Sequence, residues 1–419
     1  MKRGAVFSLA MGGALALGAE LARAADAPAS AKPPVSCKVE LTQPTWGPTI
    51  KQNPEPLCFP VPVIGDIYVG GALSAYGYTG TNPMPYSTGA ASSDRRERFD
   101  YSNLLVWMQK ADGPFQFFVM AGGYALPALG LPNLNSTEQT NRYFGPVPMA
   151  WGKFVINDEW SIQAGRLPTL IGVEPAFTFQ NPNIQRGLLV PQENVFSHGV
   201  QLNYGSGPWS ASVAATDGFY SGRINWFTGS VSYKIDESKT IGVNGGMNVS
   251  RTSEFSQSDR YKFATPLLQQ NSGIVTINYT YSSGPLTVTP YVQFTNVDRD
   301  VKIGIMNGAS TYGAAILASY AFTDNFSLAG RVEYIEQTGR RGVDTTSLLF
   351  GPGSSAFSFT ITPTFTYKRF FLRGEYSIVS LSGITRADPA EGYLVGTGFG
   401  RTGNKSEQQR FLVETGITF

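Results

Sequence analysis

The sequence predicts an all-β fold, a transmembrane antiparallel β-barrel of about 16 strands with short periplasmic turns and long extracellular loops. Three observations lead to this prediction. Apolar and polar residues alternate in segments of about ten residues, which is the length of a tilted membrane strand. Short and long connections follow each other strictly. Aromatic residues make up 13% of the chain and charged residues only 15%, a balance that suits a barrel better than a helical enzyme.

The N-terminal residues 1–24 have the pattern of a secretory signal peptide. Two basic residues precede the apolar run 5–19, and an A-x-A-like cleavage site ends at Ala24. The net formal charge of this segment is +2, equal to that of the whole chain, so the rest is formally neutral. A neutral chain gives no reason to expect a nucleic-acid partner.

Residues 25–64 are rich in proline and lack strand alternation, so we expect an extended periplasmic segment ahead of a barrel at 65–419. This segment could serve as a linker, as a partial plug or as an anchor for a periplasmic partner. Its Cys37 and Cys58 are the only cysteines. In an exported protein such a pair predicts a disulfide, with about 3 kcal/mol of stabilisation, rather than two free thiols.

The connections set the expected strand number. Seven short turn signals separate eight longer polar or glycine- and proline-rich stretches, which implies sixteen strands and places both ends of the barrel on the periplasmic side. The long stretches are 79–97, 125–147, 167–197, 217–225, 250–271, 298–310, 337–355 and 380–408.

Within the strands, parity predicts which residues face lipid and which face the lumen. In the last segment Phe411, Val413 and Phe419 share one face, and Glu414 lies on the other. The same parity places four charged residues of two further segments inside the lumen, and Lys153 is another lumen candidate. The four residues are Arg331, Glu333, Arg373 and Glu375. Aromatic residues near segment ends are expected in the interface girdles. They are Trp107, Trp151, Trp160, Trp209, Trp226, Tyr320 and Phe322.

The loop 167–197 is the strongest candidate for folding into the lumen, because Phe177, Phe179, Leu188 and Leu189 would be unexpected on a solvated loop. Charged residues of this loop and of the wall could form a constriction with a transverse field that sorts ions. The alternative is that these groups only neutralise one another. The candidate selectivity residues are Arg166, Glu174, Arg186, Glu193, Arg331, Glu333, Arg373 and Glu375.

We do not expect this protein to be an enzyme. His198 is the only histidine, and no phosphate cradle, metal-ligand cluster or hydrolase elbow is present in the sequence. We therefore predict no catalytic residue, no metal site and no cofactor. A lone histidine beside a strand start is more often structural than catalytic.

The sequence resembles the outer-membrane porins of the β-barrel porin-2 (OmpL-like) type, and the resemblance extends over 65–419. It rests on a loosely spaced central pattern and on the C-terminal nonapeptide, which looks like the general outer-membrane assembly signal ending at Phe419. The central pattern comprises Gly165, Arg166, Gly172, Glu174, Asn181, Asn183, Arg186, Gly187, His198, Gly199, Val200 and Tyr204. The cysteine-bearing extension departs from the simple pattern.

The expected function is a channel of the outer membrane through which small hydrophilic solutes diffuse passively. A substrate-specific channel is the first alternative, and a structural or anchoring barrel is the second. The expected partners are outer-membrane lipid, the barrel-assembly machinery and the solutes themselves. By analogy with porins of this size, we expect a homotrimer.

Overall fold

The computed structural model describes residues 50, 56–85, 94–253, 264, 266–340, 346–388, 390 and 395–419. The chain divides into two compact units, Met1–Lys38 and Val39–Phe419. The first unit, with the expected signal peptide and Cys37, lies outside the described residues, so the disulfide stays a prediction. All that follows concerns the second unit.

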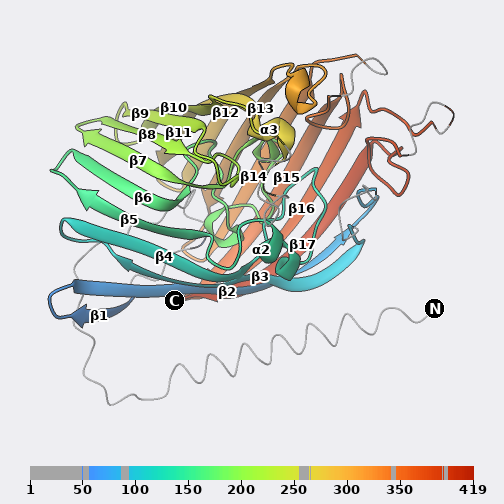
Figure 1. Ribbon diagram of the computed structural model, residues 1–419. Coiled ribbons are helices and arrows are strands. Elements are labelled where there is room, and N and C mark those ends of the chain that lie inside the picture. The colour runs from blue at the N-terminus through green and yellow to red at the C-terminus, as the bar shows by residue number, and fades with distance from the viewer. Residues whose placement is uncertain are drawn as a thin grey trace. The chain divides into compact units, whose positions relative to one another are not determined.

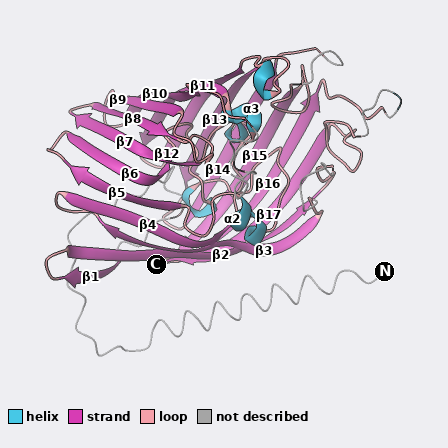
Figure 2. Cartoon of the chain, viewed as in Figure 1, coloured by secondary structure: helices cyan, strands magenta, loops and turns pink. Residues whose placement is uncertain are grey.

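One antiparallel sheet makes up nearly all of the regular structure (Figures 1 and 2). Its strands are β1 (Leu57–Val61), β2 (Gly65–Gly80), β3 (Glu97–Lys110), β4 (Phe115–Tyr124), β5 (Met149–Val155), β6 (Trp160–Pro168), β7 (Phe196–Ser206), β8 (Trp209–Thr216), β9 (Trp226–Lys234), β10 (Lys239–Asn248), β11 (Ser272–Ser283), β12 (Leu286–Val297), β13 (Ala309–Ala321), β14 (Phe326–Gln337), β15 (Ser355–Tyr367), β16 (Phe370–Ser382) and β17 (Glu407–Thr418). The helices among the described residues are short and lie in connections: α2 (Ser136–Arg142), α3 (Leu267–Gln270), η1 (Thr178–Gln180), η2 (Val190–Gln192) and η5 (Val301–Ile303).

The sheet closes on itself because β17 pairs with β2. At the end of this seam the Phe419 amide donates to the Gly71 carbonyl at 3.0 Å, and the Gly71 amide donates back at 2.8 Å. Closure leaves no open edge in β2 to β17, as a chain in hydrocarbon requires. The short β1 pairs with the first residues of β2. The predicted closed barrel of sixteen strands is therefore confirmed.

Short and long connections alternate around the whole barrel. β3 and β4 are joined through 111–114, for example, whereas β6 and β7 are joined through 169–195. All seven short turns and all eight long connections fall where the sequence predicts them, within a few residues. In the part of the chain that is described, no helix is long and apolar enough to cross a membrane.

Strand parity also agrees with the sequence. Phe411 and Ile417 face outward and are exposed on the isolated chain, whereas Leu412 and Glu414 between them are fully buried. On β14, Arg331 and Glu333 face inward while Val332 and Tyr334 face outward. An apolar outer surface over a polar inner wall is the arrangement that a lipid bilayer demands.

The aromatic girdle is only partly as expected. Near short turns, Trp160 and Trp209 face outward, and each ring packs on a tyrosine of the neighbouring strand. Tyr320 and Phe322 are likewise exposed beside their turn.

The expectation is wrong for Trp107, Trp151 and Trp226. Trp107 and Trp151 face the lumen, and Trp226 is buried with its indole nitrogen donating to the Gln270 carbonyl at 2.7 Å. For Trp107 the reason is a β-bulge, since Tyr101 pairs with Ala75 but Asn103 pairs with Ser74. The extra residue reverses the parity of the rest of β3.

Candidate functional site: the inward loop and the charged wall

The loop between β6 and β7, residues 169–195, lies inside the barrel and packs against its wall. Phe177 and Phe179 are buried in an apolar cluster that includes the inward side chains of Trp107 and Met120. The Phe179 ring stacks on Trp107 with centroids 5.7 Å apart. Further along, Leu189 is buried in a second cluster formed with strands on the other side of the lumen. The loop therefore crosses the lumen from one wall to the other.

Arg331 of β14 binds the loop at its centre. Its guanidinium contacts Glu174 of the loop at 2.8 Å and Glu333 on its own strand at 3.0 Å. It also donates to the Gln185 carbonyl at 2.8 Å. Glu333 in turn accepts the Leu188 amide at 2.8 Å. The side chains in both ion pairs are at most 1% exposed, so these contacts lie in a region of low dielectric.

Glu375 of β16 binds the next turn of the loop through its backbone. Its carboxylate accepts the amide of Ile184 at 2.5 Å and that of Gln185 at 3.0 Å. The Gln185 side chain adds a third donor at 3.0 Å, and Thr362 of β15 adds a fourth at 2.9 Å. A carboxylate that accepts two successive backbone amides fixes their orientation as well as their position.

Arg373 and Glu414 bind the first part of the loop. Arg373 donates to the carbonyls of Thr178 and Asn181 at 2.6 and 2.7 Å and pairs with Glu414 at 2.6 Å. Glu414 accepts the Thr178 hydroxyl at 2.7 Å. Loop and wall thus share buried charges, and Arg331 and Arg373 each contact a carboxylate.

Arg410 of β17 extends this network to the connection between β4 and β5. Its guanidinium donates to the carbonyls of Ala128 and Leu131 at 3.0 and 2.6 Å and to the Gln185 side chain at 3.0 Å. Asp94 lies 3.7 Å away. Neither Arg410 nor Asp94 was among the candidates predicted from the sequence. Arg410 has the same parity as Glu414, which was the available signal, whereas Asp94 lies in a connection without periodicity.

The remaining candidates on the loop are also buried. Arg186 donates to the Leu126 carbonyl at 3.2 Å and ties the loop to the neighbouring connection. Glu193 packs against Gly172, where a Cβ atom would lie 2.0 Å from the carboxylate. Burial and the nearby Glu174 carboxylate raise the pKa of Glu193 well above its usual range. Burial also raises the pKa of Glu174, despite its contact with Arg331.

Arg166 is the one candidate that lies apart from the others. It donates to the Val147 carbonyl at 2.5 Å, and its guanidinium sits 5.7 Å from the centre of the Tyr220 ring. Along β6, Arg166 has the same parity as the exposed Ile162 and Ala164, so it starts from the outer face and not from the lumen face. The structure therefore brings seven of the eight candidates into the loop and its wall, and leaves Arg166 near the end of β6.

His198 lies beside Arg166 at the start of β7. Its Nδ1 is 2.7 Å from the Asp217 carboxylate, and the same carboxylate accepts the His198 and Gly222 amides at 2.7 and 3.0 Å. This arrangement fixes the connection between β8 and β9 to β7.

The inner wall has a buried side and a side that remains open to water. The inward polar residues Lys153 of β5, Asn203 of β7 and Ser212 of β8 are half-buried. Across the barrel, Ser358 and Thr360 of β15 are completely buried. These positions of β5, β7 and β8 are therefore more accessible than the inner wall of β15.

A closed barrel of sixteen strands with an apolar outer face and a loop folded into a polar lumen defines a porin-type β-barrel of the outer membrane. The chain matches the protein family described as "Putative beta-barrel porin-2, OmpL-like" over residues 66–419, and it belongs to that family. The family and the fold together make the protein an outer-membrane channel for passive diffusion.

Solved structures with the same fold have very different sequences. The anion-selective porin from Comamonas acidovorans is 13% identical, with 84% of this chain and 99% of that chain covered and a TM-score of 0.50. The trimer form of OmpT from Vibrio cholerae is 9% identical, with 84% of this chain and 99% of that chain covered and a TM-score of 0.52. The outer membrane channel DcaP of Acinetobacter baumannii is 10% identical, with 84% of this chain and 97% of that chain covered and a TM-score of 0.51. No curated protein sequence matches the chain.

Proposed function

We propose that small hydrophilic solutes diffuse passively along the side of the lumen that the inward loop leaves free, next to β5 to β8. The observation that carries this proposal is the difference in burial between Lys153, Asn203 and Ser212 on one wall and Ser358 on the other. Polar side chains that remain in contact with water supply the surface along which a hydrated solute can move.

Introduced cysteines test this path in planar bilayers. We expect stepwise ion conductance from the purified protein, and block by a charged thiol reagent in the variant Ser212→Cys. The variant Ser358→Cys is the matched control, because its side chain is buried behind the loop and should not react. A folded protein without conductance would refute the channel, whereas equal block of both variants would refute only the path.

We propose that the candidate selectivity residues act on solutes through the loop. Glu174, Arg331, Glu333, Arg373 and Glu375 are buried between loop and wall, so their charges face each other and the loop backbone. Their role in this proposal is to set the position of the loop and hence the width of the pore. The substrate-specific alternative requires a binding site elsewhere in the lumen or at its mouth.

The proposed assembly is a homotrimer without catalytic activity. A related fold is known in a trimer form in Vibrio cholerae OmpT, and the apolar outer face offers surface for such contacts. Conductance that increases in groups of three equal steps would support the trimer, and single independent steps would contradict it. We assign His198 a structural role, so His198→Ala should leave the conductance unchanged.

We propose that Ile50 narrows the pore. Ile50, the one described residue of 1–55, is buried in the apolar cluster that contains Trp107, Phe177 and Phe179. This position favours the partial plug over the linker and the anchor.

Replacing Ile50 with aspartate should therefore raise the single-channel conductance. A carboxylate in this apolar cluster is unfavourable by several kcal/mol, so residue 50 should leave the cluster. Ile64→Asp is the control, because Ile64 lies in the turn between β1 and β2 and is 50% exposed. An unchanged conductance in Ile50→Asp would rule out this narrowing role.

A further inference from the structure

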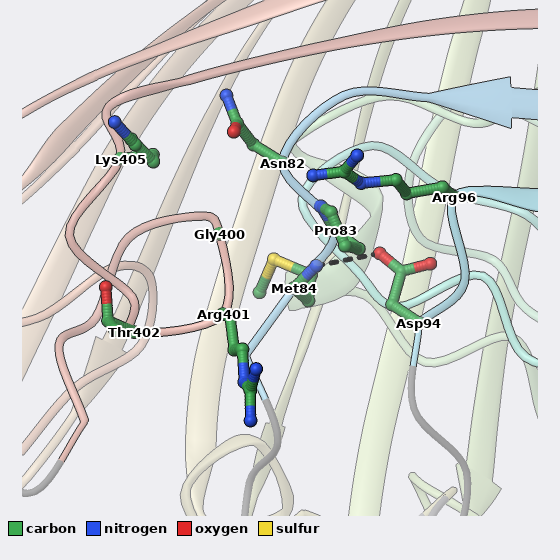
Figure 3. A pocket seen from close by; sticks show the side chains of 9 residues that line it. All are labelled: Asn82, Pro83, Met84, Asp94, Arg96, Gly400, Arg401, Thr402 and Lys405. Carbon is green, nitrogen blue, oxygen red and sulfur yellow. Dashed lines mark hydrogen bonds between the residues drawn. The ribbon is translucent and has the colours of Figure 1, made fainter.

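A cavity of about 690 Å³ lies at the long-loop end of the barrel, between the connection that follows β2 and the one that precedes β17 (Figure 3). Its size is typical of a site for a small organic molecule. Nine residues line it: Asn82, Pro83, Met84, Asp94, Arg96, Gly400, Arg401, Thr402 and Lys405.

Three of the lining residues are cations, and they come from both connections. Arg96, Arg401 and Lys405 are exposed, and none of them forms an ion pair with another described residue. In Figure 3, Lys405 lies on the opposite side of the cavity from Arg96. An anion between them would meet positive charge from more than one direction.

Asp94 is the only carboxylate among the described residues of the lining, and it is already engaged. Asp94 accepts the Met84 amide at 2.9 Å (Figure 3) and the Asn133 amide at 3.1 Å, and Arg410 lies 3.7 Å behind it. Its side chain is completely buried. Asp94 therefore supports the wall of the cavity and does not neutralise the three exposed cations.

Hydrogen bonds join the connection after β2 to the connection before β17 and to the first residues of β17, and they hold the cavity open. The Gly400 amide donates to the Pro83 carbonyl at 2.9 Å, the Gln408 side chain donates to the Asn82 carbonyl at 2.9 Å, and the Asn82 side chain donates to the Glu407 carbonyl at 2.8 Å. The two walls are thus fixed relative to each other before a ligand arrives, which lowers the entropy cost of binding.

Arg401 is presented by a tight turn. The Gly403 amide donates to the Gly400 carbonyl at 2.9 Å, and both glycines have a left-handed φ, +79° at Gly400 and +69° at Gly403. Residues other than glycine rarely adopt this left-handed backbone conformation. The turn therefore places the Arg401 backbone at a defined point of the cavity wall.

We propose that this cavity binds small anions that carry several carboxylate or phosphate groups, and that it concentrates them at the mouth of the channel. Guanidinium groups form paired, charge-assisted hydrogen bonds with such groups, and an ammonium adds a further charge. The proposal rests on the channel function and names the class of solute. The ligand is a soluble anion, because the cavity floor at Asp94 contacts the lumen residues Asn133 and Arg410, not the lipid face.

Citrate block of chloride current tests the site in bilayers of neutral lipid. Citrate on the loop side should block the wild-type protein, and the blocking concentration should rise about tenfold in Arg401→Ala and in Lys405→Ala. Arg223→Ala is the matched control, since Arg223 is an exposed cation of another long connection and does not line the cavity. Its blocking concentration should remain that of the wild type.

Each outcome separates this inference from the channel itself. Conductance with no citrate block, or with equal block in all three variants, would overturn the anion site and leave the channel intact. Block that occurs only in bilayers with phosphate-bearing lipid would also overturn it, because the cations would then bind headgroups. If the protein does not conduct, equilibrium binding of radiolabelled citrate to the detergent-solubilised protein and to Arg401→Ala still tests the site.

Discussion

Replacing Arg331 with methionine should destabilise the folded protein by about 3–5 kcal/mol and produce a wider, noisier channel. The methionine would leave Glu174 and Glu333 buried without their shared cation, and the Gln185 carbonyl would lose its donor. The middle of the loop would then lose its main contact with the wall. Two measurements check this: the temperature at which the folded band disappears on a gel, and the single-channel conductance.

A matched control and a compensated variant make this prediction specific. Arg369→Met removes an arginine from the exposed turn between β15 and β16, so both quantities should remain as in the wild type. In a triple variant with Arg331→Met, Glu174→Gln and Glu333→Gln all three charges of this group are absent, and much of the lost stability should return. If the single variant melts and conducts like the wild type, the buried network does not hold the loop.

The barrel and the parity of its wall could be predicted from the sequence because both depend on local patterns. Alternation with a period of two is set by the pleat of each strand, so it placed Arg331, Glu333, Arg373 and Glu375 inside without any knowledge of their neighbours. The girdle prediction for Trp107 rests on its place near the end of a segment, and it is wrong because that place does not fix which face the side chain takes. One extra residue near Ser102 reverses parity, and no residue type in the sequence marks that bulge.

The function of the inward charges could not be predicted because their partners are remote in the chain. Glu375 accepts the amides of Ile184 and Gln185, backbone groups that no side-chain pattern identifies. The sequence leaves two hypotheses open for these charges: a field across the pore, or mutual neutralisation. They differ only in whether the loop covers the charges. Strand pairing and loop packing determine that, and both are long-range.

Gly187 provides a test of the loop contact in which no charge is removed. A Cβ atom at this position would lie 1.9 Å from Oε1 of Glu333 and 2.8 Å from Oε1 of Glu174. Carboxylates at the ends of free side chains could move aside, but these two are held by Arg331 and by the Leu188 and Gly187 amides.

Gly187→Ala should therefore displace the loop from the wall and raise the conductance, with a loss of stability of about 1–3 kcal/mol, the usual cost of overpacking. Gly152→Ala is the control, because nothing lies within 4 Å of a Cβ atom at Gly152 on β5. If Gly187→Ala and Gly152→Ala show the same conductance and melting temperature, the loop must be able to accept a methyl group there. The close contact between its backbone and the two carboxylates would then not be what determines the width of the pore.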